Sequence, residues 1–266
     1  MKKTKGYVVR NEDCRKTIKY MKQKGIKVDC IITSPPYNTS RKVRTKKEME
    51  ERKSKYKLYD DSKPFEEYKR FVVSVVNRLD DVLVENGTII MNISYASSVE
   101  IGMIGSNLIE LLHGVITETD FDIADIICWK KKSALPNNRS KNKCTRICEF
   151  VFVMCRKKEY MTFKSNKKQT KRIEEKGLVY YSNMFNFIEA PNNDGKNPYN
   201  NATYSVEFVH NLLQMYAQDN SIVYDCFGGT CTTAVACKME NRNIKCICSE
   251  IDKEQCEYGK ERLKHG

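Results

Sequence analysis

A short apolar stretch, residues 28–33, stops abruptly at two consecutive prolines in the sequence Ser34-Pro35-Pro36-Tyr37. Proline fixes its own φ angle and keeps the preceding residue out of the helical region, so this corner is stiff and extended. A rigid corner at the end of a strand holds its polar groups in fixed directions. The corner is therefore a candidate site for chemistry, with the hydroxyl of Ser34 and the ring of Tyr37 as its side chains.

A second candidate site lies near the C-terminus, where an apolar strand leads into a turn and then a helix of small residues. The turn reads Phe227-Gly228-Gly229-Thr230. In nucleotide-binding units such glycines let the backbone approach a ligand at the helix N-terminus, and an acidic residue about 20 positions later binds the ribose hydroxyls. Glu250 ends the next strand and stands where that acid is expected. The pattern predicts a nucleotide-like cofactor.

The elements that must position these two sites alternate along the chain. Strands are expected at residues 6–10, 28–33, 87–93, 123–129, 150–155, 221–224 and 244–249. Helices are expected at residues 14–23, 65–84, 99–112, 206–217, 232–240 and 253–264. Short apolar strands separated by helices predict an α/β fold with a largely parallel sheet covered by helices on both faces.

Counting strands predicts how the sheet is ordered. Only one helix follows Glu250, so the C-terminal part of the chain supplies only two strands to the sheet that carries the cofactor turn. The N-terminal strand, which ends near Asp13, is the natural neighbour that completes it. The strand at 28–33 would then lie on the other side of the glycine strand. Ser34 and Gly229 would open on one crevice at the carboxyl ends of the strands, where open α/β sheets bind ligands.

Composition narrows the choice of partner. The chain carries 47 Lys and Arg against 34 Asp and Glu, a net charge of +13, which favours a polyanion such as nucleic acid. Three basic segments, residues 39–57, 130–146 and 156–176, begin at or just after strand ends and suggest loops gathered on one rim. The longest apolar runs are far shorter than the roughly 20 residues of a membrane span, and the N-terminus lacks the apolar stretch of a signal peptide. The 12 cysteines and 3 histidines lack the paired spacing of zinc sites, so no metal is expected.

Taken together, the motifs resemble those of a known family. Thr33-Ser34-Pro35-Pro36-Tyr37 resembles the catalytic signature of the amino-methylating DNA methyltransferases. Residues 225–233, Asp-Cys-Phe-Gly-Gly-Thr-Cys-Thr-Thr, resemble their S-adenosylmethionine turn, Asp-Pro-Phe-x-Gly-Ser-Gly-Thr-Thr. The catalytic signature precedes the cofactor turn, which is the permuted order of the family's beta class. The resemblance extends over nearly the whole chain and implies a Rossmann-like fold that uses S-adenosylmethionine.

Departures from the family pattern fall inside the cofactor turn. Cys226 replaces the usual proline, Thr230 replaces serine, and Cys231 replaces the third glycine. Cys231 thus carries a side chain where the backbone normally approaches the cofactor. Small residues replace small residues throughout, so a working site is still expected.

The resemblance also implies the reaction. The exocyclic amine of a base is a poor nucleophile because its lone pair is delocalised into the ring. The Ser34 hydroxyl and the Pro35 carbonyl would hold the two amine hydrogens and direct the lone pair at the methyl group, with Pro36 stiffening the corner. The target base must be flipped out of the duplex, and Tyr37 would stack on it.

Further residues receive roles from the same resemblance. Cofactor contacts are implied for Asp13, Asp225, Phe227, Gly228, Gly229, Thr230, Thr232 and Glu250. Of these, Glu250 would hold the ribose hydroxyls and Asp13 would reach the adenine amino group, although Asp13 could equally be an ordinary helix N-cap. Asn38 would serve either the base or the turn. The basic segments would bind phosphates, with Arg41, Lys42, Lys130, Lys132 and Arg139 as candidates.

The sequence leaves two alternatives for the base whose exocyclic amine is methylated. Serine at position 34 resembles the cytosine-N4 enzymes and favours them, with adenine-N6 as the alternative. An RNA methyltransferase, an inactive DNA-binding relative and a nicotinamide oxidoreductase rank below both.

The predicted organisation is a catalytic half over residues 1–155, a target-recognition segment over 156–200 and a cofactor half of the same domain over 201–266. Double-stranded DNA is the expected partner, and a homodimer and a cognate restriction endonuclease are also considered. We expect a cytoplasmic, nucleoid-associated protein in a bacterium or phage, or a nuclear or viral-factory protein in a eukaryote or virus.

Overall fold

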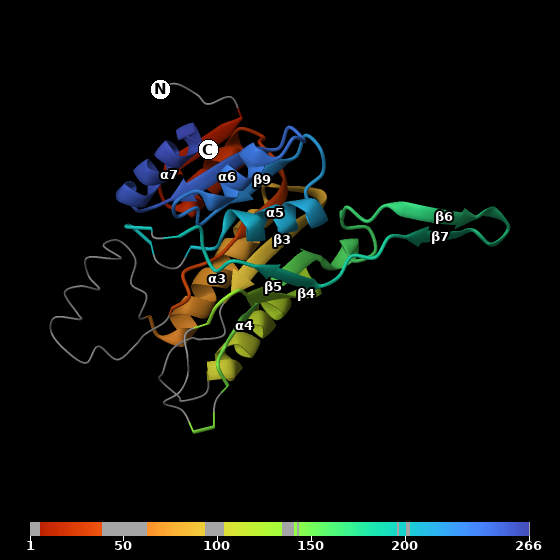
Figure 1. Cartoon of the computed structure of the whole chain (residues 1–266), viewed down its shortest axis with the longest axis horizontal. Coiled ribbons are helices and arrows are strands. Elements are labelled where there is room, and N and C mark those ends of the chain that lie inside the picture. The colour runs from red at the N-terminus through yellow and green to blue at the C-terminus, as the bar shows by residue number, and fades with distance from the viewer. Residues whose placement is uncertain are drawn as a thin grey trace.

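The computed structural model describes residues 6–38, 63–93, 104–134, 141–142, 144–195, 197–200 and 203–265 (Figure 1). Its centre is an eight-stranded sheet in the order β1-β10-β9-β2-β3-β5-β4-β8. These strands are β1 Tyr7–Asn11, β2 Val28–Thr33, β3 Leu83–Ile93, β4 Phe121–Lys131, β5 Cys148–Arg156, β8 Phe187–Ala190, β9 Ile222–Asp225 and β10 Lys245–Glu250. The main helices are α1 Cys14–Gln23, α3 Phe65–Asp80, α4 Ile104–Glu118, α5 Val206–Tyr216, α6 Thr232–Met239 and α7 Lys253–His265.

The strand order confirms the arrangement expected from the sequence. β1 pairs in parallel with β10, β10 with β9, and β9 with β2. The N-terminal strand therefore lies beside β10, and β2 lies on the other side of β9. β5 runs antiparallel to both β3 and β4, so the sheet is largely parallel. We call the edge at which β1, β2, β3, β4, β9 and β10 end the carboxyl edge.

Helices cover both faces of the sheet, and each face has its own apolar core. On one face α5 and α6 pack on the sheet through residues such as Phe208, Leu212 and Ala236. On the other face α1 and α3 contribute Ile18 and Val76. Burial on both faces explains why β2 reads as an almost unbroken apolar run in the sequence. No helix in the described part of the chain is long and apolar enough to cross a membrane.

Some expected boundaries are wrong. The helix expected at 65–84 ends at Asp80, because the chain turns there and Leu83 already begins β3. The helix expected at 99–112 continues to Glu118, and residues 99–103 lie outside the described residues.

The segment 156–200 holds strands that the sequence did not indicate. β8 joins the main sheet beside β4, with Ile188 and Ala190 buried in the core. β6 Gln169–Ile173 and β7 Leu178–Tyr181 form a separate antiparallel hairpin that projects from the body (Figure 1).

The basic segments 130–146 and 156–176 do not begin at one rim, and residues 39–57 lie outside the described residues. Because β5 is antiparallel, the segment that follows Arg156 begins at the edge opposite the carboxyl edge. The base of the hairpin is held there by Asn166, whose side-chain amide donates to the carbonyls of Gln214 and Ala217 at the end of α5. The described start of the segment 130–146 lies at the end of β4 and therefore at the carboxyl edge.

Candidate active site

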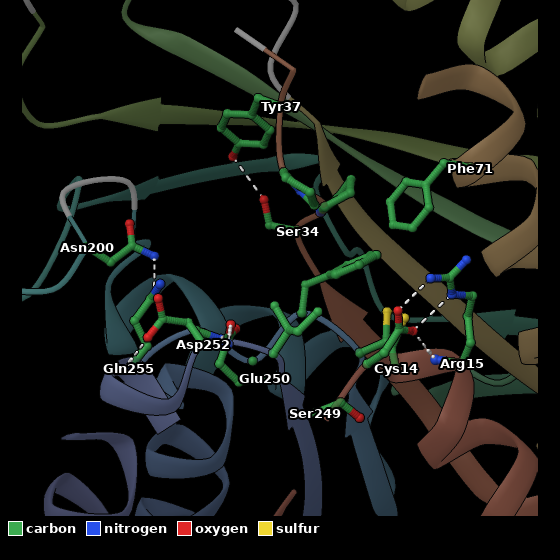
Figure 2. Close-up of a pocket in the computed structure, with 18 of the residues that line it drawn as sticks. Cys14, Arg15, Ser34, Tyr37, Phe71, Asn200, Ser249, Glu250, Asp252 and Gln255 are labelled. Atoms are coloured by element: carbon green, nitrogen blue, oxygen red, sulfur yellow. Dashed lines mark hydrogen bonds and ion pairs between the residues drawn. The ribbon is translucent and has the colours of Figure 1, made fainter. Parts of the chain in front are cut away.

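A cavity of about 780 Å³ opens at the carboxyl edge and is lined by both motifs. Residues 34–37 form one wall, and residues 226–230 with Glu250 form another. Figure 2 shows Ser34 and Tyr37 facing Glu250 across this space. Ser34 and Gly229 therefore share one crevice, as the strand order predicted.

The glycine turn is held tightly against the end of β10. The amide of Gly228 donates to the carbonyl of Ser249 at 2.8 Å, and a Cβ at Gly228 would come within 3.0 Å of the Cβ of Cys248. Gly229 has φ of +50°, a conformation that favours glycine. Its amide donates to Oε2 of Glu250 at 2.7 Å, and Oε1 of Glu250 accepts from the amide of Asp252 at 2.8 Å. The Glu250 carboxylate is therefore fixed at the cavity wall, and its burial raises its pKa.

Cys231 does not obstruct the cavity. It sits at the N-terminal end of α6 with φ of +61°, is fully buried, and is absent from the cavity wall. A Cβ built on Gly259 would lie 2.9 Å from the Cβ of Cys231 and closer still to its Sγ, so the thiol fills the space above this glycine of α7. Gly259 thus accommodates the side chain that replaces the family's third glycine.

Asp225 lies behind the turn and does not line the cavity. Its carboxylate accepts hydrogen bonds from Thr33 Oγ1 at 2.7 Å, Thr233 Oγ1 at 2.6 Å and Tyr204 OH at 3.0 Å. It also accepts from the amide of Phe227 at 3.1 Å. Burial raises the pKa of Asp225 to about 7, although the hydrogen bonds from Thr233 and Thr33 act in the opposite direction. Its contacts show that Asp225 shapes the turn from behind.

Asp13 is both a helix N-cap and a residue of the cavity wall. It is the N-cap of α1 and accepts from the amide of Arg15 at 2.8 Å. It also lines the cavity. The Arg15 guanidinium, 2.6 Å from Asp13 Oδ2, lowers the pKa of this carboxyl.

The catalytic corner is backed by a polar network. The Ser34 hydroxyl is within hydrogen-bond distance of Tyr37 OH at 3.0 Å and of the Asn92 carbonyl at 3.1 Å. Tyr37 OH reaches Oε2 of Glu149 at 3.3 Å and accepts from Nδ2 of Asn92 at 2.8 Å. Glu149 is ion-paired with Lys131. Figure 2 shows the phenol of Tyr37 pointing back toward Ser34.

The side chain of Asn38 binds the backbone just before α3. It is fully buried, has φ of +52°, and both ends of its side-chain amide bond to the backbone of Lys63 at 2.9 Å. Of the phosphate candidates, Lys130 and Lys132 lie at the carboxyl edge and pair with Glu189 at 2.8 Å and Glu207 at 3.6 Å. Arg41, Lys42 and Arg139 lie outside the described residues.

Several cavity residues carry no sequence signal. α3 contributes Glu67, Arg70, Phe71 and Ser74 to the wall. The ring of Phe71 lies 5.9 Å from that of Phe227. The apolar face of α3 was readable from its periodicity, but nothing local shows which side chains face a cavity. Among the described residues, no group of three or more His, Cys, Asp or Glu is arranged to hold a metal ion.

Comparison with known proteins decides the family. The model of the N6/N4 DNA methylases matches residues 28–261. The chain belongs to this DNA methylase family. It is thus an amino-methylating DNA methyltransferase, and its family uses S-adenosylmethionine. This membership excludes the oxidoreductase alternative.

Solved structures show the same fold as this methyltransferase. M1.HpyAVI in complex with S-adenosylmethionine is 22% identical, with a TM-score of 0.59, over 97% of this chain and 99% of that one. The PvuII cytosine-N4-specific DNA methyltransferase is 17% identical with a TM-score of 0.69, over 97% and 86%. A DNA modification methylase from Thermus thermophilus, complexed with S-adenosylmethionine, is 15% identical with a TM-score of 0.57, over 97% and 93%. No curated protein sequence matches the chain.

Proposed function

We propose that this enzyme methylates the exocyclic N4 of cytosine in double-stranded DNA, on a base flipped into the cavity at the carboxyl edge. The observation that carries the proposal is the single cavity shared by the Ser34 corner and the Gly229 turn. Cytosine is preferred over adenine because a serine, rather than an aspartate or asparagine, stands at the corner.

The residues around the cavity fit the cofactor that the family uses. The backbone-fixed carboxylate of Glu250 presents its remaining lone pairs to ribose hydroxyls, and residues 227–230 with Thr232 line the approach beside it. Asp13, held by Arg15, would reach the adenine amino group. When bound, S-adenosylmethionine supplies an activated methyl group on its sulfonium sulfur.

On the other side of the cavity, the corner orients the acceptor amine. The Ser34 oxygen and the Pro35 carbonyl receive its two hydrogens, which turns the nitrogen lone pair toward the methyl group. Pro35 is buried and Pro36 follows it, so these acceptors do not reorganise during the reaction. Tyr37 offers the face of its ring to the flipped base, while its hydroxyl is anchored behind.

DNA should approach the carboxyl edge, since the target base must enter there. The target-recognition segment 156–200 then divides into two parts. Residues 191–200 reach the cofactor turn: Asp194 pairs with Arg262 at 2.9 Å, and Asn197 donates to Thr230 Oγ1 at 3.0 Å. The β6–β7 hairpin lies at the opposite edge. We place target reading with residues 191–200 and the other loops of the carboxyl edge.

A DNA-modifying enzyme works where DNA is held, which for a bacterial or phage protein is the nucleoid-containing cytoplasm. A restriction endonuclease of the same specificity and a second copy of this chain are the further partners we propose.

The deciding experiment treats unmethylated DNA with purified enzyme and isotope-labelled S-adenosylmethionine, then identifies the labelled nucleosides by mass spectrometry. N4-methylcytosine is expected, and exclusive N6-methyladenine would assign the enzyme to the alternative amine. A parallel incubation with RNA should give no label. Absence of label from every substrate, together with retained cofactor binding by calorimetry, would identify an inactive relative.

A further inference from the structure

Behind the catalytic corner, buried polar groups form a continuous chain that ends in a charge. It runs from Ser34 through Tyr37 to Glu149, which is held by Lys131, and Asn92 joins it from β3. Asn92 is 2% exposed, and the side chains of Glu149 and Lys131 are 13% and 22% exposed. None of these three residues lines the cavity, so they do not contact a ligand there.

The charges at the far end determine which way each hydrogen bond points. Glu149 is a carboxylate paired with Lys131, whose ammonium also lies 4.9 Å from the ring of Trp129. A carboxylate can only accept, so Tyr37 must donate its hydroxyl hydrogen to Glu149. The side-chain amide of Asn92 must likewise turn its NH₂ group toward Glu149, at 2.9 Å.

Asn92 shows how strongly this orientation is enforced. Its Oδ1 is buried without a hydrogen-bond partner among the described residues, which is unfavourable. Rotating the amide would give Oδ1 a new position, but it would place that oxygen against the Glu149 carboxylate. The interaction with the Glu149 carboxylate therefore sets the orientation of the Asn92 amide, even though Oδ1 is left without a hydrogen-bond partner among the described residues.

The same logic reaches Ser34. A serine hydroxyl can donate or accept, whereas the reaction requires an acceptor that faces the amine. The Tyr37 oxygen has given its hydrogen to Glu149, so toward Ser34 it can only accept. The Asn92 carbonyl, 3.1 Å from Ser34 Oγ, is a second group that can only accept. The Ser34 hydrogen is thus drawn into the protein.

We propose that Glu149, fixed by Lys131, is a positioning residue that acts through Tyr37 to keep both lone pairs of the Ser34 oxygen free for the amine of the target base. This inference rests on the proposed role of Ser34 as an acceptor, but it does not depend on which base is methylated. An aspartate at the corner would accept without help. A serine depends on groups around it to set the direction of its hydrogen.

The test is a double-mutant cycle between Glu149→Gln and Tyr37→Phe. In Glu149→Gln, Lys131 will retain the oxygen of the new side-chain amide, so the NH₂ group faces Tyr37 and reverses the relay. With the carboxylate gone the Asn92 amide is also free to turn, so the Tyr37 hydrogen is shared between Asn92 Oδ1 and Ser34 and occupies a Ser34 lone pair part of the time. We expect kcat for methyl transfer to fall about two- to tenfold, the effect of one neutral hydrogen bond, with unchanged S-adenosylmethionine affinity.

Tyr37→Phe removes the relay without reversing it. Ser34 still donates to the Asn92 carbonyl and the aromatic ring is kept, so kcat should fall less than in Glu149→Gln. The double variant Tyr37→Phe/Glu149→Gln should match Tyr37→Phe and be more active than Glu149→Gln alone. Glu189→Gln, which breaks the neighbouring Lys130 ion pair on the same sheet, is the matched control and should leave kcat unchanged.

Recovery in the double variant is not expected from a structural role, because two damaging changes would then reduce activity further. Additive losses in the cycle, or a Glu149→Gln enzyme with wild-type kcat, would overturn the inference. Ser34→Ala separates this from a failure of the proposed function. If Ser34→Ala keeps full activity, the acceptor role itself is wrong, whereas a strong loss there without recovery in the double variant rejects only the relay.

Discussion

Thr33 Oγ1 donates a 2.7 Å hydrogen bond to Asp225 Oδ1 and thereby joins the last residue of the catalytic strand to the last residue of the cofactor strand. Thr33 immediately precedes Ser34, and Asp225 immediately precedes the turn. The same threonine oxygen accepts from the amide of Phe227 at 3.2 Å. This buried contact sets the spacing between the amine acceptor and the cofactor turn.

Thr33→Val should therefore lower both stability and activity. The substitution keeps the shape but leaves Asp225 and the Phe227 amide each with one hydrogen bond fewer. We expect a loss of about 2 kcal/mol in the free energy of unfolding, measured by urea titration, and a reduced kcat. Thr88→Val is the matched control, since among the described residues the hydroxyl of this buried threonine meets only the Cys30 sulfur, at 3.6 Å. Equal losses in both variants would contradict a special role for Thr33.

Asp225 should make stability depend on pH. Its pKa is raised to about 7 in the folded protein, so the folded state binds its proton more tightly than the unfolded state. The contribution to stability is then fully present below the unfolded pKa, near 4, and is lost as pH rises to 7. Asp225→Asn remains neutral. The stability difference between wild type and this variant should shift by about 3 kcal/mol between pH 5 and pH 8, in favour of wild type at pH 5. A constant difference would show that Asp225 stays ionised.

Cys231 and Gly259 should be energetically coupled. Gly259→Ala places a methyl group against the Cys231 sulfur, closer than van der Waals contact allows, and should destabilise the protein by about 1 to 3 kcal/mol. In a Cys231→Gly background the sulfur is gone, and most of that loss should disappear in thermal or urea unfolding. Cys231→Gly alone should leave S-adenosylmethionine affinity within about twofold of wild type, because the thiol faces α7. A large change in affinity would mean that the thiol does approach the cofactor.

The hairpin can be removed without cutting the sheet. The amide of Ser182 donates to the carbonyl of Lys168 at 2.8 Å, so two glycines can replace residues 169–181. Because the hairpin lies away from the carboxyl edge, cofactor binding and methylation of a duplex just long enough to cover the target should be retained. Affinity for long duplexes at low salt should fall, since Lys171, Arg172 and Lys176 are lost. Failure to bind the short duplex would show that the hairpin reaches the target.

The sequence predicted the elements whose signals are local. Apolar runs marked the strands, two short motifs marked the sites, and the shortage of strands after Glu250 placed β1 beside β10. No comparable local signal marks the side chains that contact residues on other strands. Glu149 reads as an acid beginning a strand, and only the antiparallel pairing of β5 brings it to Tyr37. β8 carries a glutamate among its four residues and so does not read as an apolar run, and its place in the sheet depends on its pairing with β4.

The same distinction, between local signals and contacts with distant parts of the chain, applies to the site residues. Glu250 and the glycines were placed correctly at the cavity because their role depends on the backbone around them. Asp225 was expected at the cofactor and Asn38 at either the base or the turn, and the side-chain polar atoms of both are bound to other parts of the protein. The sequence alone does not show which group a polar residue of a motif will bind.

The pairing of β1 with β10 affects how the enzyme is made. Tyr7 lies opposite Cys246, so β1 leaves the ribosome long before the strand with which it pairs. Until β10 has been made, the part of the sheet that ends at Glu250 cannot form, although the corner at residues 34–37 was synthesised much earlier. Long-range parallel pairing is slow, so the nascent chain exposes an unfinished sheet edge through most of translation. The site for the methyl donor is therefore completed only once β10 has been made. A product truncated before that strand could not modify DNA.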